Sequence, residues 1–62
     1  MIYTIEIRRA QRLVCSISDR FTDDAAAIAD AKTELEKAAA EEARVYKFGL
    51  SSRDRIAILK PL

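Results

Sequence analysis

The sequence predicts a two-layer α+β domain with the element order ββαββ, in which one long alanine-rich helix covers one face of a four-stranded antiparallel sheet. Two observations support this fold class. Segments in which apolar and polar residues alternate flank the middle of the chain, as in half-buried strands. The middle, from about Asp23 to Arg44, consists almost entirely of strong helix formers and contains no Gly or Pro. At 62 residues, the chain is expected to form a single domain, residues 1–62.

The first two strands are expected at residues 2–8 and 12–18, where β-branched and other apolar residues recur at every second position. The short link between them favours an antiparallel hairpin, and its turn type is left open because it contains no Asn-Gly or Asp-Gly pair. Cys15 is expected to be buried as a small hydrophobic side chain. The side chains expected to face the helix are Tyr3, Ile5, Ile7, Leu13, Cys15 and Ile17.

The start of the helix is marked by residues that suit a free amino end. Thr22 is expected to be the N-cap, followed by Asp23 and Asp24 at the positive end of the helix dipole. Phe21 is expected to fold back onto the first turns. An advance of 100° per residue groups the apolar positions into one buried stripe. The stripe comprises Ala25, Ile28, Ala31, Leu35 and Ala39.

The predicted helix is longer than the predicted strands. It would span roughly 33 Å, whereas strands of six or seven residues span roughly 20–24 Å. Its last turns, from Lys37 to Arg44, are therefore expected either to project from the sheet or to be covered by a partner.

The last two strands are expected at residues 45–50 and 55–60, joined by a polar loop at residues 49–54 that contains Ser51 and Ser52. Pro61 is expected to end the fourth strand. The preferred strand order is 2-1-3-4, which makes every pairing antiparallel, and 1-2-4-3 remains the alternative. The side chains expected to face the helix are Tyr46, Phe48, Leu50, Ile56 and Ile58.

The other face of the sheet is expected to lack a helix and to be partly apolar. Its expected members are Ile2, Thr4, Glu6, Arg8, Val14, Ser16, Ser18, Val45, Lys47, Ala57 and Leu59. An interaction surface is expected where its apolar members gather. These are Ile2, Val14, Val45, Ala57 and Leu59. Because chains below roughly 70–80 residues seldom build a large core, a homodimer through this surface or through a sheet edge is expected.

Charge divides the chain, although its net charge is only +1. Residues 22–44 hold seven acidic and three basic residues, and the remainder holds eight basic and three acidic residues. The basic residues considered as contacts are Arg8, Arg12, Lys47, Arg53 and Arg55. They favour, as an alternative function, a nucleic-acid-binding or regulatory module. Whether they converge on one patch is left open, and the absence of aromatic residues from the predicted open face argues against single-strand recognition.

The composition points away from catalysis. The chain has no His, one Cys and one Gly, so no metal site, activated nucleophile or phosphate-binding loop can be assigned. We therefore expect a protein that is not an enzyme and uses no cofactor or metal. A lone Cys without a disulfide suits a cytoplasmic location. No secretory signal and no apolar run of roughly 20 residues is found, so no membrane association is expected.

Three segments carry a resemblance to known proteins: Asp23–Lys32, the strand at Val45–Lys47 and the closing Arg55–Pro61. Together they resemble short uncharacterised bacterial proteins with a ββαββ layout, a likeness that covers most of the chain and implies no known activity. The strands that lead into the helix also resemble the HicB type of antitoxin. The chain lacks that family's Gly-rich segment, so its function is not carried over. The expected function is a small bacterial protein-interaction module, homodimeric or bound to an unidentified protein.

Overall fold

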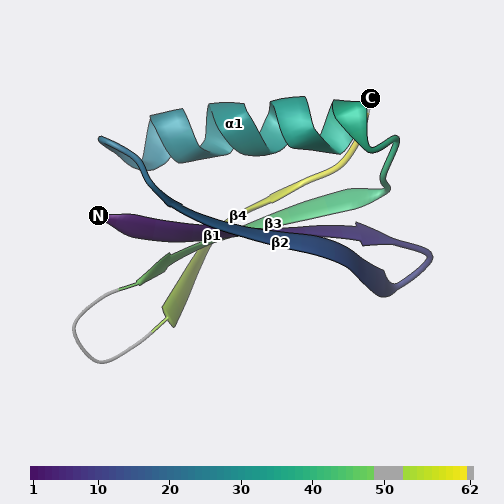
Figure 1. The fold of residues 1–62 in the computed structure, drawn as a ribbon, viewed down its shortest axis with the longest axis horizontal. Coiled ribbons are helices and arrows are strands. Elements are labelled where there is room, and N and C mark those ends of the chain that lie inside the picture. The colour runs from purple at the N-terminus through teal and green to yellow at the C-terminus, as the bar shows by residue number, and fades with distance from the viewer. Residues whose placement is uncertain (49–52, 62) are drawn as a thin grey trace.

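The computed structural model describes residues 1–48 and 53–61 and has the predicted ββαββ order (Figure 1). Its strands are β1 (Ile2–Arg9), β2 (Arg12–Arg20), β3 (Glu42–Phe48) and β4 (Arg53–Leu59), and its helix is α1 (Asp24–Lys37). The strands form one antiparallel sheet in the order β2-β1-β3-β4, which was the preferred order. The helix lies across one face of this sheet (Figure 1). The expected positions of Leu50, Ser51 and Ser52 lie outside the described residues.

The β1–β2 hairpin closes through a two-residue turn at Ala10 and Gln11. Both residues have positive φ, 52° and 63°, which is the pattern of a type I′ turn. The backbone N–H of Ala10 donates to Glu41 Oε2 at 3.1 Å, so a residue near the start of β3 holds the turn. One irregularity follows the turn: Ile7 lies opposite Cys15 and Arg8 lies opposite Leu13, which leaves Val14 as an extra residue in β2.

The helix begins one residue later than predicted. Asp23, not Thr22, is the N-cap: its backbone is extended, and its side-chain oxygen accepts a 2.8 Å hydrogen bond from the N–H of Ala26. Asp24 occupies the first turn, as expected. The ring of Phe21 lies edge-on to that of Tyr3 in β1, with 5.9 Å between the ring centroids.

The helix is also shorter than predicted. It has 14 residues and ends at Lys37 rather than Arg44, because Ala39 takes a left-handed φ of 49°. The N–H of Ala40 then reaches back to the carbonyl of Leu35 at 3.1 Å, a Schellman-type end. Ala43, which has a high helix propensity, instead lies fully buried in β3, so sheet pairing outweighs local preference. At about 21 Å the helix fits its sheet, and the expected overhang is absent.

Side chains of α1, β1 and β3, together with Ala40 between the helix and β3, supply the core. Its buried members are Tyr3, Ile5, Ile7, Ala27, Ala31, Leu35, Ala40, Ala43 and Val45. The predicted helix stripe is right for Ala31 and Leu35. It is wrong for Ala25, which is exposed while Ala27 is buried, and for Ala39, which lies beyond the end of the helix. Alanine at the two most buried helix positions brings α1 close to the strands.

The predicted faces are inverted along β3 and at residues 57–59 of β4, whereas Ile56 packs against the core as predicted. Val45 lies between Ile5 and Ala57 on the helix side, so the neighbouring Tyr46 lies on the other face. The sequence interpretation placed the larger aromatic side chains inside. The close approach of α1 instead leaves room for small side chains, and Ala43 and Val45 fill it. A second irregularity leaves Ile56 as an extra residue in β4, after which Ile58 faces outward and is 39% exposed.

Strand β2 is left outside the core. Among the described elements, α1 contacts β3, β1 and β4 and does not reach β2. Cys15 shares the helix side of the sheet with Ile7, but it is exposed rather than buried as predicted. Leu13 is 51% exposed, and Ile17 alone in this strand is partly buried against the core. The prediction of an inward apolar face on β2 failed for two reasons: the helix does not reach this strand, and the extra residue Val14 places Leu13 opposite Arg8 on the other face of the sheet.

Candidate functional site

The strongest candidate site is the sheet face opposite α1, here called the open face. Directly opposed residues on antiparallel strands project to the same side, so the strand pairings define this face. Tyr3 and Lys47 lie on the side of the sheet that faces the helix, because both contact Asp24 of α1. The open face comprises Ile2, Thr4, Glu6, Arg8, Leu13, Ser16, Ser18, Arg20, Glu42, Arg44, Tyr46, Phe48, Arg53, Arg55 and Ile58.

Arginine dominates the charge of the open face. Every strand contributes at least one: Arg8 from β1, Arg20 from β2, Arg44 from β3, and Arg53 and Arg55 from β4. Glu6 and Glu42 are the acidic residues among its members. The helix side carries most of the acidic residues, so the charge division seen along the chain becomes a division between the two layers.

Glu6 and Arg53 form the centre of the open face. Arg53 Nη2 donates to Glu6 Oε2 at 2.7 Å, and the Arg53 guanidinium carbon lies 3.7 Å from the centroid of the Tyr46 ring. Its hydrogen bond to Glu6 raises the pKa of Arg53 above the usual value, although burial opposes the shift. Arg8 approaches the other oxygen of Glu6 at 3.9 Å. The guanidinium of Arg53 is therefore held over an aromatic ring by a carboxylate.

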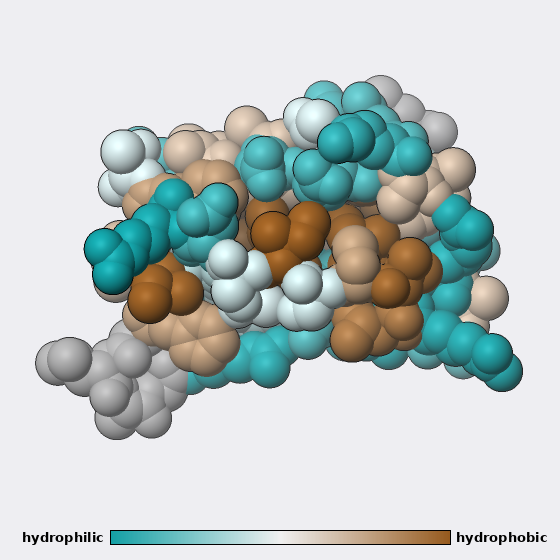
Figure 2. All heavy atoms as spheres, viewed as in Figure 1, coloured by the Kyte–Doolittle hydropathy of each residue, from teal (hydrophilic) through white to brown (hydrophobic). Residues whose placement is uncertain are grey.

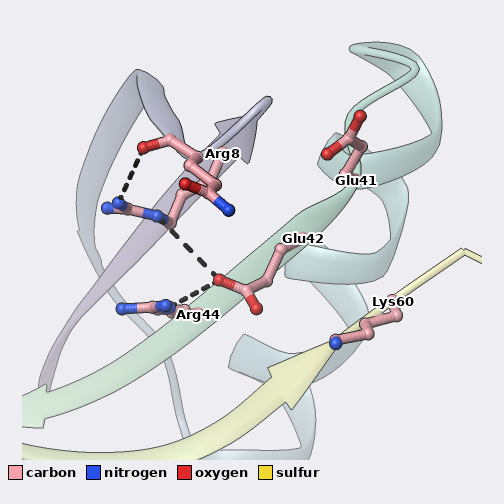
Figure 3. A pocket seen from close by; sticks show the side chains of 6 residues that line it. Arg8, Glu41, Glu42, Arg44 and Lys60 are labelled. Atoms are coloured by element: carbon pink, nitrogen blue, oxygen red, sulfur yellow. Dashed lines mark hydrogen bonds and ion pairs between the residues drawn. The ribbon is translucent and has the colours of Figure 1, made fainter.

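Glu42 organises a second group of charges at the β1–β2 turn end of the open face. Its Oε2 lies 2.6 Å from Arg44 Nε and 3.9 Å from Arg8 Nε (Figure 3). The hydrogen bond to Glu42 is the main cause of a raised pKa for Arg44. A shallow hollow surrounds this carboxylate, with the amine of Lys60 at its other side (Figure 3). Its lining residues are Arg8, Gln11, Glu41, Glu42, Arg44 and Lys60.

Two aromatic rings also lie on the open face, contrary to the prediction that it has none. Tyr46 lies opposite Thr4 and Arg55, and Phe48 lies opposite Arg53. Phe48 is 39% exposed. Thr4 is 6% exposed and bonds Ser18 through their hydroxyl oxygens at 3.0 Å, so this face is packed although no helix covers it.

The five predicted apolar surface residues do not form one patch. Ile2 and Val14 are 47% and 49% exposed, whereas Val45 is fully buried. Ala57 and Leu59 lie opposite Val45 and Ala43 on the helix side and are partly buried. The patch on which the sequence prediction of a dimer through that surface depended is therefore not formed, because Val45, Ala57 and Leu59 face the helix instead.

Three of the five predicted basic contacts converge on the open face: Arg8, Arg53 and Arg55. Lys47 lies on the helix side with its Nζ 3.4 Å from Asp24 Oδ1, and Arg12 lies opposite Arg9 beside the hairpin turn. The sequence argument missed Arg20, Arg44 and Lys60. Arg20 would have followed from a second strand drawn out to that residue, because alternation places it beside Ile2. Arg44 required the inverted phase of β3, which places it beside Glu6.

Comparisons with protein-family models, with curated proteins and with solved structures find no match for this chain. Within residues 1–48 and 53–61, no group of three or more His, Cys, Asp and Glu side chains is placed to hold a metal ion. Over the same residues, no helix combines the length and apolar character needed to cross a membrane.

Proposed function

We propose that the open face binds single-stranded nucleic acid. The observation that carries this proposal is the set of five arginines, drawn from all four strands, that surround two aromatic rings on one face of the sheet. Phosphate groups are recognised by Arg side chains, and unpaired bases stack on aromatic rings and on guanidinium planes. A four-stranded sheet backed by a helix offers both kinds of contact on one surface.

The two glutamates do not cancel this basic character. Each guanidinium has five N–H donors, and a carboxylate contact occupies only one or two of them. Glu6 and Glu42 hold Arg53 and Arg44 in defined positions, at 2.7 and 2.6 Å. Arg20 and Arg55 are exposed and add charge at the margins. The glutamates therefore serve to order the arginines, and the excess positive charge remains available to phosphates.

This proposal reverses the ranking suggested by the sequence, where a protein-interaction module was preferred. That preference depended on an apolar open face. With Val45 buried and Tyr46 turned outward, the same surface is basic and aromatic. An acidic protein partner remains a second occupant that the same arginines would attract, and the experiment must separate the two.

The test is fluorescence anisotropy with labelled oligo-dT, oligo-rU and a DNA duplex, at low and at near-physiological salt. We expect the single strands to bind more tightly than the duplex, with affinity that falls steeply as salt increases. Arg55→Glu, at an exposed position on the open face, is expected to weaken binding at least about fivefold.

The matched control is Lys32→Glu, which makes the same change in net charge on the exposed surface of α1. It should leave binding nearly unchanged, because Lys32 lies in the opposite layer. Equal losses in both variants, or no binding of any oligonucleotide at low salt, would rule the proposal out. Binding of polyglutamate with equal affinity would assign the face to an acidic protein instead.

A further inference from the structure

The outer edge of β2 carries exposed apolar residues and is paired with no other strand among residues 1–48 and 53–61. Leu13, Val14 and Cys15 are exposed, and Ile17 is only partly buried. Figure 2 looks toward this edge and shows apolar groups in a band between the hydrophilic surface of α1 and a hydrophilic lower rim. Met1 and Ile2, 60% and 47% exposed, extend the apolar surface at the start of β1. An edge strand of this kind is a site for pairing with another strand.

The direction of the free backbone groups follows from the pairing of β2 with β1. The N–H of Phe21 donates to the carbonyl of Met1 at 3.2 Å. Because Ile2 pairs with Arg20, Met1 and Phe21 are the next pair along the two strands, and this bond makes them a hydrogen-bonded pair. In an antiparallel ladder, hydrogen-bonded and non-hydrogen-bonded pairs alternate. Residues 17 and 19 therefore bond to β1, while Ser16 and Ser18 direct their N–H and C=O groups toward the open edge.

We propose that β2 pairs antiparallel with β2 of a second copy of this chain, about a two-fold axis at Ser16. In this register Ser16 lies opposite Ser16 of the second copy. The two strands are then joined by the backbone N–H and C=O groups that point away from β1. Cys15 lies opposite Ile17 of the second copy, and the reverse pair forms on the other side of the axis. Four apolar side chains that α1 leaves uncovered would then cover one another on the helix side of a continuous sheet.

Charge complementarity is what identifies a second copy as the occupant. Val14 is an extra residue in β2, and beyond it the register moves by one residue. When β2 pairs with β2 of the second copy, this shift of one residue places Arg12 opposite Asp19 of the second copy. Both lie on the helix side, since Arg12 is opposite Arg9 and Asp19 is opposite Tyr3. Without this irregularity, Arg12 would meet Arg20. On its helix side, β2 thus carries Arg12 near one end and Asp19 near the other, and an antiparallel copy pairs these two charges twice.

A two-fold axis perpendicular to the sheet fits this arrangement. Residues of the same face meet across it, so both helices lie on one side and both open faces lie on the other. Pairing through β2 leaves the open face exposed. This inference is therefore independent of the proposed binding of nucleic acid, and its test needs no ligand.

Charge reversal tests the register. The dimer dissociation constant is measured by analytical ultracentrifugation from about 10 to about 500 micromolar, the range expected for a small interface. Asp19→Arg and Arg12→Asp are each expected to weaken the dimer about tenfold, because each change is made twice in a symmetric interface. The double variant restores both pairs and should regain affinity to within about threefold. Glu36→Arg, the same kind of reversal on the exposed surface of α1, is the control and should have no effect.

Disulfide trapping tests the position of the axis. With Cys15 replaced by Ser, a cysteine introduced by Ser16→Cys faces its own copy at about 5.5 Å between Cα atoms, within disulfide range. Ser18→Cys in the same background is the control, since residues two positions from the axis lie roughly 13 Å apart. We expect rapid oxidation to a dimer for the first variant and little for the second.

A mass of 7.0 kDa across the whole concentration range would overturn the inference. So would a dimer that ignores both charge reversals, or one that the double variant fails to restore, since its interface would lie elsewhere. Circular dichroism of each variant confirms that the fold is kept. Because the restored double variant carries both substitutions, misfolding of the single variants cannot imitate the expected pattern.

Discussion

The phenol of Tyr3 donates a 2.6 Å hydrogen bond to Oδ1 of Asp24, which ties β1 to the first turn of α1. Tyr3 is 1% exposed, and Lys47 reaches the same carboxylate oxygen from β3 at 3.4 Å. Three elements thus meet at one oxygen atom at the amino end of the helix. This contact has consequences for stability at both ends of the pH range.

On the alkaline side, stability should fall as Tyr3 ionises. Its hydrogen bond to Asp24, with burial and the nearby acidic charge, raises the pKa of Tyr3 from 10.0 to about 12. A raised pKa stabilises the fold fully below pH 10, and the contribution is lost as the pH rises toward about 12. Thermal unfolding of Tyr3→Phe should show a lower melting temperature at pH 7 and a smaller further decrease above pH 10. If the melting temperature of the parent protein and that of Tyr3→Phe decrease equally above pH 10, the ionisation of Tyr3 is not the cause.

On the acid side, Asp24 should govern part of the loss of stability. The hydrogen bond from Tyr3, assisted by Lys47, lowers the pKa of Asp24 below 3.8, although burial opposes the shift. Its contribution is present above pH 3.8 and disappears as the pH falls through the lower folded value. Urea unfolding of Asp24→Asn between pH 2 and pH 6 should show a flatter dependence on pH than the parent protein. Asp30→Asn, at another position of the same helix, provides the comparison.

Glycine should stabilise the protein at one position of the α1 region and destabilise it at another. Ala39 has a φ of 49°, a conformation that costs a non-glycine residue roughly 1 kcal/mol. Ala39→Gly should therefore raise the free energy of unfolding by about 0.5–1 kcal/mol. Ala29→Gly, an exposed position within the helix, should lower it by about 1 kcal/mol. Chemical denaturation measures the free energy of unfolding of both variants. If glycine lowered it at both positions, residue 39 would lie inside the helix.

The inverted faces of β3 can be tested by two truncations. Val45 is fully buried, so Val45→Ala should cost about 2 kcal/mol of unfolding free energy. Phe48 is 39% exposed on the open face, and Phe48→Ala should cost less than about 1 kcal/mol despite the larger loss of side-chain atoms. The reverse order would restore the face assignment predicted from alternation alone.

The sequence predicted the element order, the preferred strand order and the buried face of β1, because these depend on strong local signals. Alternation in β1 pairs the apolar positions with β-branched and aromatic residues, and Tyr3, Ile5 and Ile7 are all buried. The end of the helix could not be predicted in this way. Residues 38–41 have high helix propensity, but the left-handed φ of Ala39 ends the helix and the burial of Ala43 against β1 draws the chain into the sheet.

The candidate site was misjudged for a related reason. Alternation in β3 offers two possible phases, and side-chain size favoured Tyr46 and Phe48 as the buried set. The choice depends on how near α1 approaches the sheet, which is a property of packing between distant segments. One inverted phase moved two aromatic rings and Arg44 onto the open face and removed its apolar patch. The two extra residues, Val14 and Ile56, had no signal in the sequence.

The helix crosses three strands and leaves the fourth uncovered, so nearly all of β2 is free of packing constraints. Eight of its nine residues are exposed, and only Ile17 meets the core. Substitutions along this strand should therefore have little effect on folding, and evolution could alter them at small structural cost. Any residue that is preserved there across diverged relatives would be preserved for contacts outside the chain.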